Sequence, residues 1–134
     1  MRRIALFTLA LLPLSLLAAD WPQWRGPGRD SILQGAAWPE KLTGLEKTWR
    51  VALDKGYPGP IVSKDRVWVA ETKNAKDEVV RCLDRATGKQ IWETSWPGSM
   101  SVPFFARSNG SWIRATPAFD GESLFVAGMR DVLV

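Results

Sequence analysis

The chain has 134 residues and no histidine, and its 18 lysines and arginines against 14 aspartates and glutamates give a formal net charge of +4. Without histidine, this segment excludes a Ser-His-Asp hydrolase, a histidine-ligated zinc site and a CxxCH haem attachment. Basic residues alternate with acidic ones, as in Lys64-Asp65-Arg66, and form no stripe with interleaved aromatic residues. Nucleic acid is therefore not an expected partner, because single-strand binders use such a stripe.

Residues 1–19 have the features of a secretory signal peptide. Arg2 and Arg3 form a positively charged start, Ile4 to Leu17 form an apolar core, and Ala18-Ala19 suit cleavage before Asp20. The core is shorter than the roughly 18 residues of a spanning helix, so an uncleaved anchor is the weaker alternative and no integral membrane segment is expected after cleavage. The paired arginines also suit twin-arginine export, but ordinary secretion is favoured over it. The protein is expected to be periplasmic or secreted.

Residues 20–46 are predicted to be an irregular extension that packs against the rest of the fold. They begin with the sequence DWPQWRGPGRD, which is too irregular for a helix and too aromatic for a disordered linker. An alternative role is a surface that stacks on carbohydrates or cations through Trp21, Trp24 and Arg25. The structural role is favoured.

Two similar segments each predict a β-hairpin. Residues 59–70 and 116–127 align with an offset of 57 residues, from Pro60 to Pro117, and Val69 then matches Val126. Each segment has a short strand, a polar turn and a second strand rich in β-branched and aromatic residues. The turns are predicted at Lys64-Asp65 and at Asp120-Gly121.

Two tryptophans indicate a longer repeat. Trp49 and Trp92 lie 43 residues apart, and the second follows the sequence LDRATGKQI at 83–91. In that turn, Asp84 can bond to its own backbone and Gly88 can take a positive φ. Trp92 is then expected to lie flat against a neighbouring sheet, with Thr87 or a backbone carbonyl accepting its indole N–H. A period of about 40 to 45 residues with four short strands is typical of a β-propeller.

This stretch resembles the repeat of pyrroloquinoline-quinone-type (PQQ-like) β-propellers, whose blades dock on one another through a Trp after such a turn. The WPQWRGP opening resembles the segment ahead of many exported propellers of that type. The resemblance covers residues 20–134 and implies an all-β propeller with four-stranded blades. Its structural motif would comprise Asp84, Thr87, Gly88, Trp92 and Trp49.

The segment Lys47-Thr48-Trp49-Arg50-Val51-Ala52-Leu53 alternates apolar and other residues, which predicts a half-buried strand. The resemblance implies that this strand completes the last blade of the ring. The partner of Trp49 is then expected to lie outside this chain.

The length of the chain limits how much of a propeller it contains. A closed propeller needs about four to eight blades, whereas residues 47–134 hold roughly one and a half. We therefore expect an N-terminal fragment that is truncated in its second blade, because an open stack would expose an apolar edge. The alternative is a ring closed by several copies of the chain. The number of blades does not follow from the sequence.

The stretch from Trp96 to Ile113 lengthens an inter-blade loop and is the candidate ligand-binding region. The candidate contacts in the central funnel are Trp96, Arg107, Trp112 and the nearby Arg114. Tryptophan stacking with an arginine fork suits a planar aromatic cofactor or an anionic substrate. The favoured alternative is that the aromatic side chains cover a blade face or are buried under the N-terminal extension, with Arg114 in a structural pair.

Two functions fit the resemblance. The first is a non-catalytic scaffold that presents loops or strand edges to other exported or envelope proteins. The second is a PQQ-dependent dehydrogenase that oxidises alcohols or sugars, with pyrroloquinoline quinone and Ca²⁺ on the propeller axis and an active site largely outside this segment. That family usually has adjacent cysteines, whereas this chain has only Cys82. Cys82 is predicted to be a buried apolar residue, with a reactive thiol as the alternative. The scaffold is favoured, and no catalytic residue or metal ligand is assigned.

Overall fold

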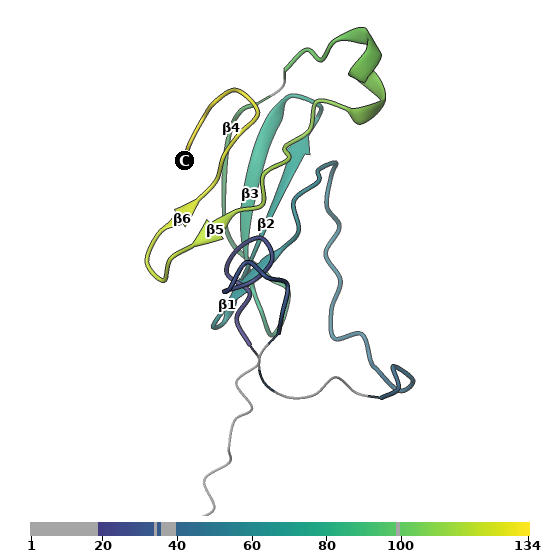
Figure 1. Ribbon diagram of the computed structural model, residues 1–134, viewed down its shortest axis with the longest axis vertical. Coiled ribbons are helices and arrows are strands. Elements are labelled where there is room, and N and C mark those ends of the chain that lie inside the picture. Colours follow the sequence, from purple (N-terminus) through teal and green to yellow (C-terminus); the bar gives the residue numbers. More distant parts are fainter. Residues whose placement is uncertain (1–18, 34, 36–39, 99) are drawn as a thin grey trace, which may run out of the picture.

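The computed structural model describes residues 19–33, 35, 40–98 and 100–134 (Figure 1). The protein is mostly β, which confirms the all-β prediction at this level. A four-stranded antiparallel sheet contains, in chain order, β1 (Ile61–Ser63), β2 (Arg66–Lys73), β3 (Asp77–Asp84) and β4 (Gln90–Pro97). A two-stranded sheet contains β5 (Ala118–Phe119) and β6 (Leu124–Phe125), and a 3-10 helix, η1, spans Phe104–Asn109. The predicted signal peptide lies outside the described residues, apart from Ala19.

Both predicted hairpins are present. β1 and β2 are joined at Lys64-Asp65, where Lys64 has a φ of 51°. β5 and β6 are joined by a turn in which the Asp120 carboxylate accepts the backbone N–H groups of Glu122 and Ser123, at 2.9 and 2.8 Å. Both hydrogen bonds lower the pKa of Asp120 below its ordinary value of 3.8, and the bond from Ser123 has the larger effect. The second hairpin pairs over only two residues in each strand.

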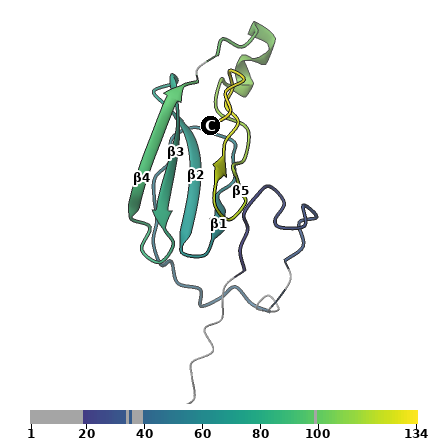
Figure 2. The ribbon, with the colours of Figure 1, turned by 90° about the vertical axis from the view of Figure 1, so that its left-hand side faces the viewer.

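Both faces of β2 and β3 are buried, because successive side chains of a strand point to opposite faces. On one side, which we call the Trp49 face, Trp49 and Val51 cover Val67, Val69 and Leu83. The opposite side, which we call the hairpin face, lies under β5, β6 and the residues that flank them (Figure 2). The buried apolar side chains that the four strands place on the hairpin face are Ile61, Trp68, Ala70, Val80 and Cys82.

β4 is the exposed edge of the four-stranded sheet. Seven of its eight residues are exposed, and Trp96 is half-buried. Trp92 pairs with Cys82 of β3, so both side chains lie on the hairpin face, because directly opposite residues share a face. However, Trp92 is 40% exposed. No second sheet among the described residues covers Trp92, so its docking against a neighbouring sheet stays a prediction.

Residues 47–53 do not form a strand, contrary to the prediction. Their backbone makes no ladder, and the first backbone pairing in this region is an isolated bridge between Lys55 and Thr72 of β2. The segment instead crosses the Trp49 face, where the Arg81 side chain donates a 2.7 Å hydrogen bond to the carbonyl of Ala52. A segment that covers a sheet face needs alternating apolar side chains, and so does an edge strand. The alternating pattern of residues 47–53 therefore could not distinguish the two structures.

The N-terminal extension joins the two sheets. Trp21 exchanges two backbone hydrogen bonds with Val62 of β1, at 2.7 and 2.9 Å. The next residue, Pro22, accepts the N–H of Phe119 of β5 at 2.9 Å. Because β1 and β5 lie side by side, these three bonds hold the hairpin against the four-stranded sheet.

A buried carboxylate fastens the C-terminal segment to β3. Glu78 is 0% exposed, and its two oxygens accept the indole N–H of Trp96 at 2.7 Å and the backbone N–H of Met129 at 2.9 Å. A buried carboxylate without such partners would be very costly. Gly98 and Gly128 pack directly against it, so a side chain at either position would displace the carboxylate.

Candidate functional site

One carboxylate organises the turn between β3 and β4. Asp84 accepts the backbone N–H of Thr87 at 2.8 Å and the Thr87 hydroxyl at 2.7 Å. These two hydrogen bonds lower the pKa of Asp84 below its ordinary value of 3.8, and the bond from the hydroxyl has the larger effect. Gly88 then adopts a φ of 71°, and its N–H donates to the Asp84 carbonyl at 2.8 Å. The three residues together make one tight turn.

Trp49 packs on this turn. Its indole N–H donates to the carbonyl of Arg85 at 2.9 Å. A Cβ added at Gly88 would lie only 2.7 Å from the Trp49 ring, so glycine is required both for the close approach and for the positive φ. We call this interaction of Trp49 with Arg85 and Gly88 the Trp49 contact. Trp49 therefore finds a partner within the chain, contrary to the expectation.

Trp92 has no equivalent contact among the described residues. The turn between β5 and β6 does not supply one, because an added Cβ at its Gly121 would meet nothing within 4 Å. Thr87, one predicted acceptor for the indole of Trp92, has its hydroxyl engaged with Asp84 and with the N–H of Lys89. Trp92 thus presents a large, partly exposed ring on the hairpin face of β4.

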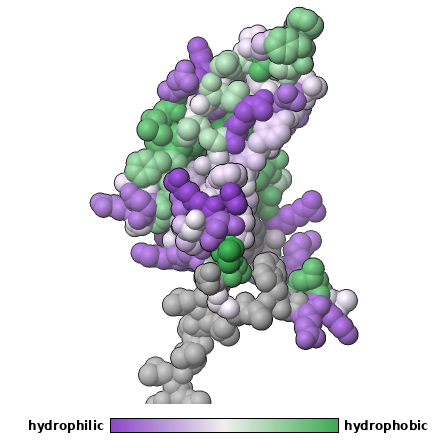
Figure 3. All heavy atoms as spheres, viewed as in Figure 1, coloured by the Kyte–Doolittle hydropathy of each residue, from purple (hydrophilic) through white to green (hydrophobic). Residues whose placement is uncertain are grey.

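Figure 3 shows further exposed apolar side chains, and two areas of them lie close to the sheets. One lies over η1, where Phe104 and Phe105 are largely exposed and pack edge to face. The other lies along β6 and the chain after it, where Phe125 and Leu133 are exposed.

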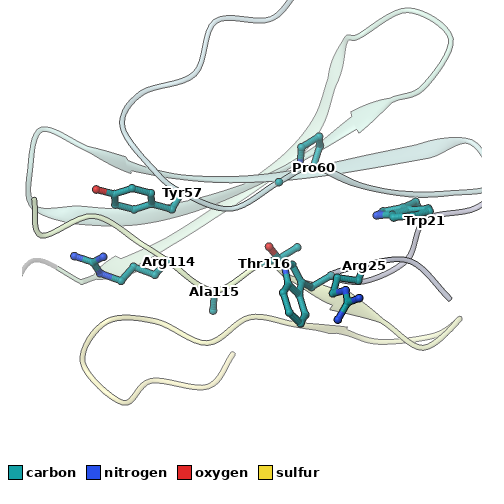
Figure 4. A pocket seen from close by; sticks show the side chains of 9 residues that line it. Trp21, Arg25, Tyr57, Pro60, Arg114, Ala115 and Thr116 are labelled. Atoms are coloured by element: carbon teal, nitrogen blue, oxygen red, sulfur yellow. The ribbon is translucent and has the colours of Figure 1, made fainter. Parts of the chain in front are cut away.

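A cavity of about 560 Å³ opens between the N-terminal extension and the segments that lead into β1 and β5 (Figure 4). We call it the arginine cavity, because two of its lining residues are arginines and none is acidic. Its volume is in the range of small-molecule sites. It is lined by Trp21, Trp24, Arg25, Tyr57, Gly59, Pro60, Arg114, Ala115 and Thr116. Figure 4 shows Arg114 beside Tyr57 at one end of the cavity and Arg25 toward the end where Trp21 lies.

Arg114 is held by an aromatic pair and by backbone carbonyls. Its guanidinium lies 5.0 Å from the ring centre of Tyr57, whose ring centre lies 5.8 Å from that of Trp112. Its Nη2 donates to the carbonyls of Gly110 at 2.9 Å and Asn109 at 3.3 Å. The Tyr57 hydroxyl donates to the same Asn109 carbonyl at 2.7 Å. These contacts restrict the rotamer of Arg114 without neutralising its charge.

At the other end, Arg25 and Trp24 project from a loop that Trp21 anchors. The Arg25 guanidinium lies 5.4 Å from the ring centre of Trp24, and its Nε donates to the Ser31 hydroxyl at 3.0 Å. Trp21 packs closely on Gly26, which has a φ of 79°. Trp24 remains 64% exposed. Of the three residues considered for a stacking surface, Trp21 has a packing role, whereas Trp24 and Arg25 remain accessible.

The predicted funnel-loop residues separate into two groups. Trp112 and Arg114 meet at Tyr57, beside the arginine cavity. Trp96 is engaged by Glu78, and Arg107 is exposed on η1, so neither lines this cavity. Their role as ligand contacts stays a prediction.

Sequence reasoning missed Tyr57 and Pro60 as lining residues. A signal for them existed in the repeat, because Gly59-Pro60 aligns with Thr116-Pro117. Aligned positions ahead of β1 and β5 come together once these strands lie side by side. The cavity therefore forms between equivalent ends of the two hairpin copies.

Cys82 is buried on the hairpin face at 1% exposure, and this burial raises the pKa of its thiol. Within the described ranges, no group of three or more Cys, Asp or Glu side chains is placed to hold a metal ion. In the same part of the chain, no helix has the length and apolar character needed to cross a membrane.

Similarity to known proteins does not assign this site. No family model matches the chain, and neither a curated protein nor a solved structure matches it.

Proposed function

We propose that the chain forms successive blades of an exported β-propeller with PQQ-like, Trp-docking repeats, and that this propeller is a non-catalytic binding scaffold. In this proposal the four-stranded sheet is one blade. Residues 47–53 belong to the layer before it, and β5 and β6 begin the blade after it.

A repeated relation between layers carries the proposal. Three positions of the aligned hairpin copies contact the layer that precedes each hairpin. They are Val62, Val67 and Val69 in the first copy and Phe119, Leu124 and Val126 in the second. In the first copy these side chains pack against the preceding segment, with Trp49 and Val51. In the second copy the same positions pack against the preceding sheet, on its hairpin face. Each layer thus presents the same side to the layer before it, as successive blades around one axis do.

The proposal also accounts for two exposed aromatic rings. Phe125 occupies the position of Trp68 in the aligned copy. Trp68 is covered by Phe119 of the following layer, with ring centres 4.6 Å apart, so Phe125 would be covered by the next layer in turn. Trp92 on β4 would dock on the turn of a following blade, as Trp49 docks on the turn of this one.

The alternative is a PQQ-dependent dehydrogenase. The residues described here do not fit the quinone and Ca²⁺ of that family. Cys82 is the only cysteine and is buried in the core, so the adjacent pair that the resemblance implies is missing from this sequence. The arginine cavity has no carboxylate in its lining to bind Ca²⁺. No residue of this chain is assigned to an oxidation step.

Hydroxyl-radical footprinting of the native exported protein tests the docking arrangement. Radical oxidation is measured by mass spectrometry at Trp92 and Phe125, with the exposed Trp24 and the packed Trp49 as internal references. We expect Trp92 and Phe125 to oxidise slowly, like Trp49, because further layers cover them. Oxidation of Trp92 as fast as that of Trp24 would refute the docking of a following blade.

The intact mass and absorbance spectrum of the same sample separate the two functions. A mass well above 15.0 kDa without quinone absorbance supports the scaffold. Quinone absorbance that survives dialysis overturns it in favour of the dehydrogenase. A mass no larger than that of this chain, with Trp92 protected, would mean that several copies close the ring.

A further inference from the structure

The arginine cavity concentrates positive charge without a balancing acid. Arg25 and Arg114 line it, and none of its lining residues is acidic. Among the described residues, neither guanidinium takes part in a salt bridge, whereas Arg66, Arg81 and Arg85 each lie within ion-pair distance of a carboxylate. Two unpaired guanidinium groups at one cavity suit an anionic ligand, because charge-assisted hydrogen bonds from a guanidinium to a carboxylate are stronger than neutral ones.

Arg114 has donors left for such a ligand. Of its five N–H donors, those on Nη2 are directed to the carbonyls of Asn109 and Gly110, and those on Nη1 and Nε remain. Tyr57 serves to position this guanidinium, because Arg114 and Trp112 pack on its ring and its hydroxyl bonds to Asn109. The orientation of Arg114 is therefore set before a ligand arrives.

Trp24 and Arg25 add a different kind of contact at the other end. Arg25 uses Nε to bond to Ser31, which leaves its two terminal nitrogens. Trp24 is 64% exposed with Arg25 stacked near one face of its ring, so the other face can receive a ligand. The C–H groups of a pyranose ring fit the negative face of an indole. Of the aromatic rings that line the cavity, Trp24 is more exposed than Tyr57, at 64% against 52%, so we place a sugar ring on Trp24.

We propose that the arginine cavity binds a short acidic oligosaccharide, an oligomer of uronic acids, with carboxylates on Arg25 and Arg114 and one sugar ring on Trp24. The open mouth and the volume of about 560 Å³ suit such a ligand. The Thr116 hydroxyl, also in the lining, offers a further polar contact. This site goes beyond the scaffold function and does not depend on it.

Isothermal titration calorimetry of the full native protein with trigalacturonic acid tests the proposal, with the neutral galactotriose as the matched sugar. We expect one-to-one binding of the acid that weakens as salt is added and little binding of the neutral trimer. Arg114→Gln and Arg25→Gln should each weaken binding about tenfold or more, because each removes a charge-assisted contact. Trp24→Ala should weaken it about fivefold, the middle of the range for one stacking contact. Arg107→Gln, an exposed arginine of η1 outside the cavity, should leave it unchanged.

Three results would overturn the proposal. The first is an absence of trigalacturonate binding, and the second is equal binding of the neutral trimer. The third is equally tight binding of inorganic sulfate, which would make the cavity a simple anion site. The far-UV circular dichroism of each variant is compared with that of the parent protein. If Arg25→Gln fails to fold, Arg114→Gln and Trp24→Ala still decide the question. Failure here leaves the footprint of Trp92 unchanged, so the two proposals fail separately.

Discussion

Gly88→Ala should destabilise the protein mainly through Trp49. The substitution places a Cβ 2.7 Å from the ring of Trp49 and puts a non-glycine residue at a φ of +71°. The left-handed backbone alone costs about 1 to 2 kcal/mol. Displacing the ring also weakens its hydrogen bond to Arg85, at about 1 kcal/mol, and part of its packing on Val67 and Leu83. We therefore expect a loss of about 2 to 4 kcal/mol in the free energy of unfolding.

A double-mutant cycle separates the two causes. In a Trp49→Ala background the ring is absent, so Gly88→Ala should cost only the backbone strain of about 1 to 2 kcal/mol. The difference between the two backgrounds is the interaction energy of the Trp49 contact, which we expect to be at least about 1 kcal/mol. Gly121→Ala is the matched control, because Gly121 has a φ of +111° with no atom within 4 Å of an added Cβ.

Urea denaturation followed by far-UV circular dichroism measures these energies without relying on tryptophan fluorescence, which Trp49→Ala would itself change. Gly121→Ala should cost the same in both backgrounds. An equal cost of Gly88→Ala in both backgrounds would show that the approach of Trp49 to Gly88 contributes nothing to stability, and the Trp49 contact would lose its role as an inter-layer dock.

Three further perturbations probe other parts of the fold. Gly98→Ala should cost about 2 kcal/mol or more in urea denaturation, because the new methyl group collides with the buried side chain of Glu78; a neutral effect would mean that this carboxylate moves freely. The pKa of Asp84 in the folded protein is lowered by its bonds to Thr87. Its carboxylate therefore contributes fully to stability at pH values above 3.8, the ordinary pKa of the group. This contribution is lost as the pH falls through the lower pKa of the folded state. Asp84→Asn should therefore flatten the acid limb of a plot of Tm against pH, and an unchanged limb would contradict this. Cys82, whose pKa burial raises, should react with iodoacetamide far more slowly in the native protein than in urea, whereas equal rates would place the thiol at the surface.

Local signals predicted the hairpins and the β3–β4 turn correctly. Asp84 and Gly88 both act within the turn itself: the Asp84 carboxylate bonds to a backbone N–H of the turn, and Gly88 adopts a positive φ. The polar turn at Lys64-Asp65 likewise lies between two paired strands, the second of which is rich in β-branched and aromatic residues. Such features depend on neighbours in the chain, so the sequence is sufficient to locate them.

Features that depend on tertiary contacts were predicted less well. The alternation in residues 47–53 showed correctly that Trp49 and Val51 are half-buried, but a face-covering segment and an edge strand give the same pattern. The buried Glu78 gave no signal, because its partners, Trp96 and Met129, come from two distant segments. The arginine cavity likewise depends on the side-by-side position of β1 and β5, which no local pattern encodes.

One insertion accounts for the difference between the two repeat lengths. The tryptophans repeat after 43 residues and the hairpins after 57, and the extra length falls between Trp96 and Ile113. The structure uses this insertion for η1 and for the chain that leads into β5, outside the buried layers. A longer loop costs little stability, because closure entropy rises slowly with loop length. The insertion can therefore carry Trp112 and Arg114 to the edge of the cavity while Trp49, Val69 and Val126 keep the layers in register. The insertion thus brings Trp112 beside Tyr57 at one end of the cavity, whereas Arg25 reaches the other end from the N-terminal extension.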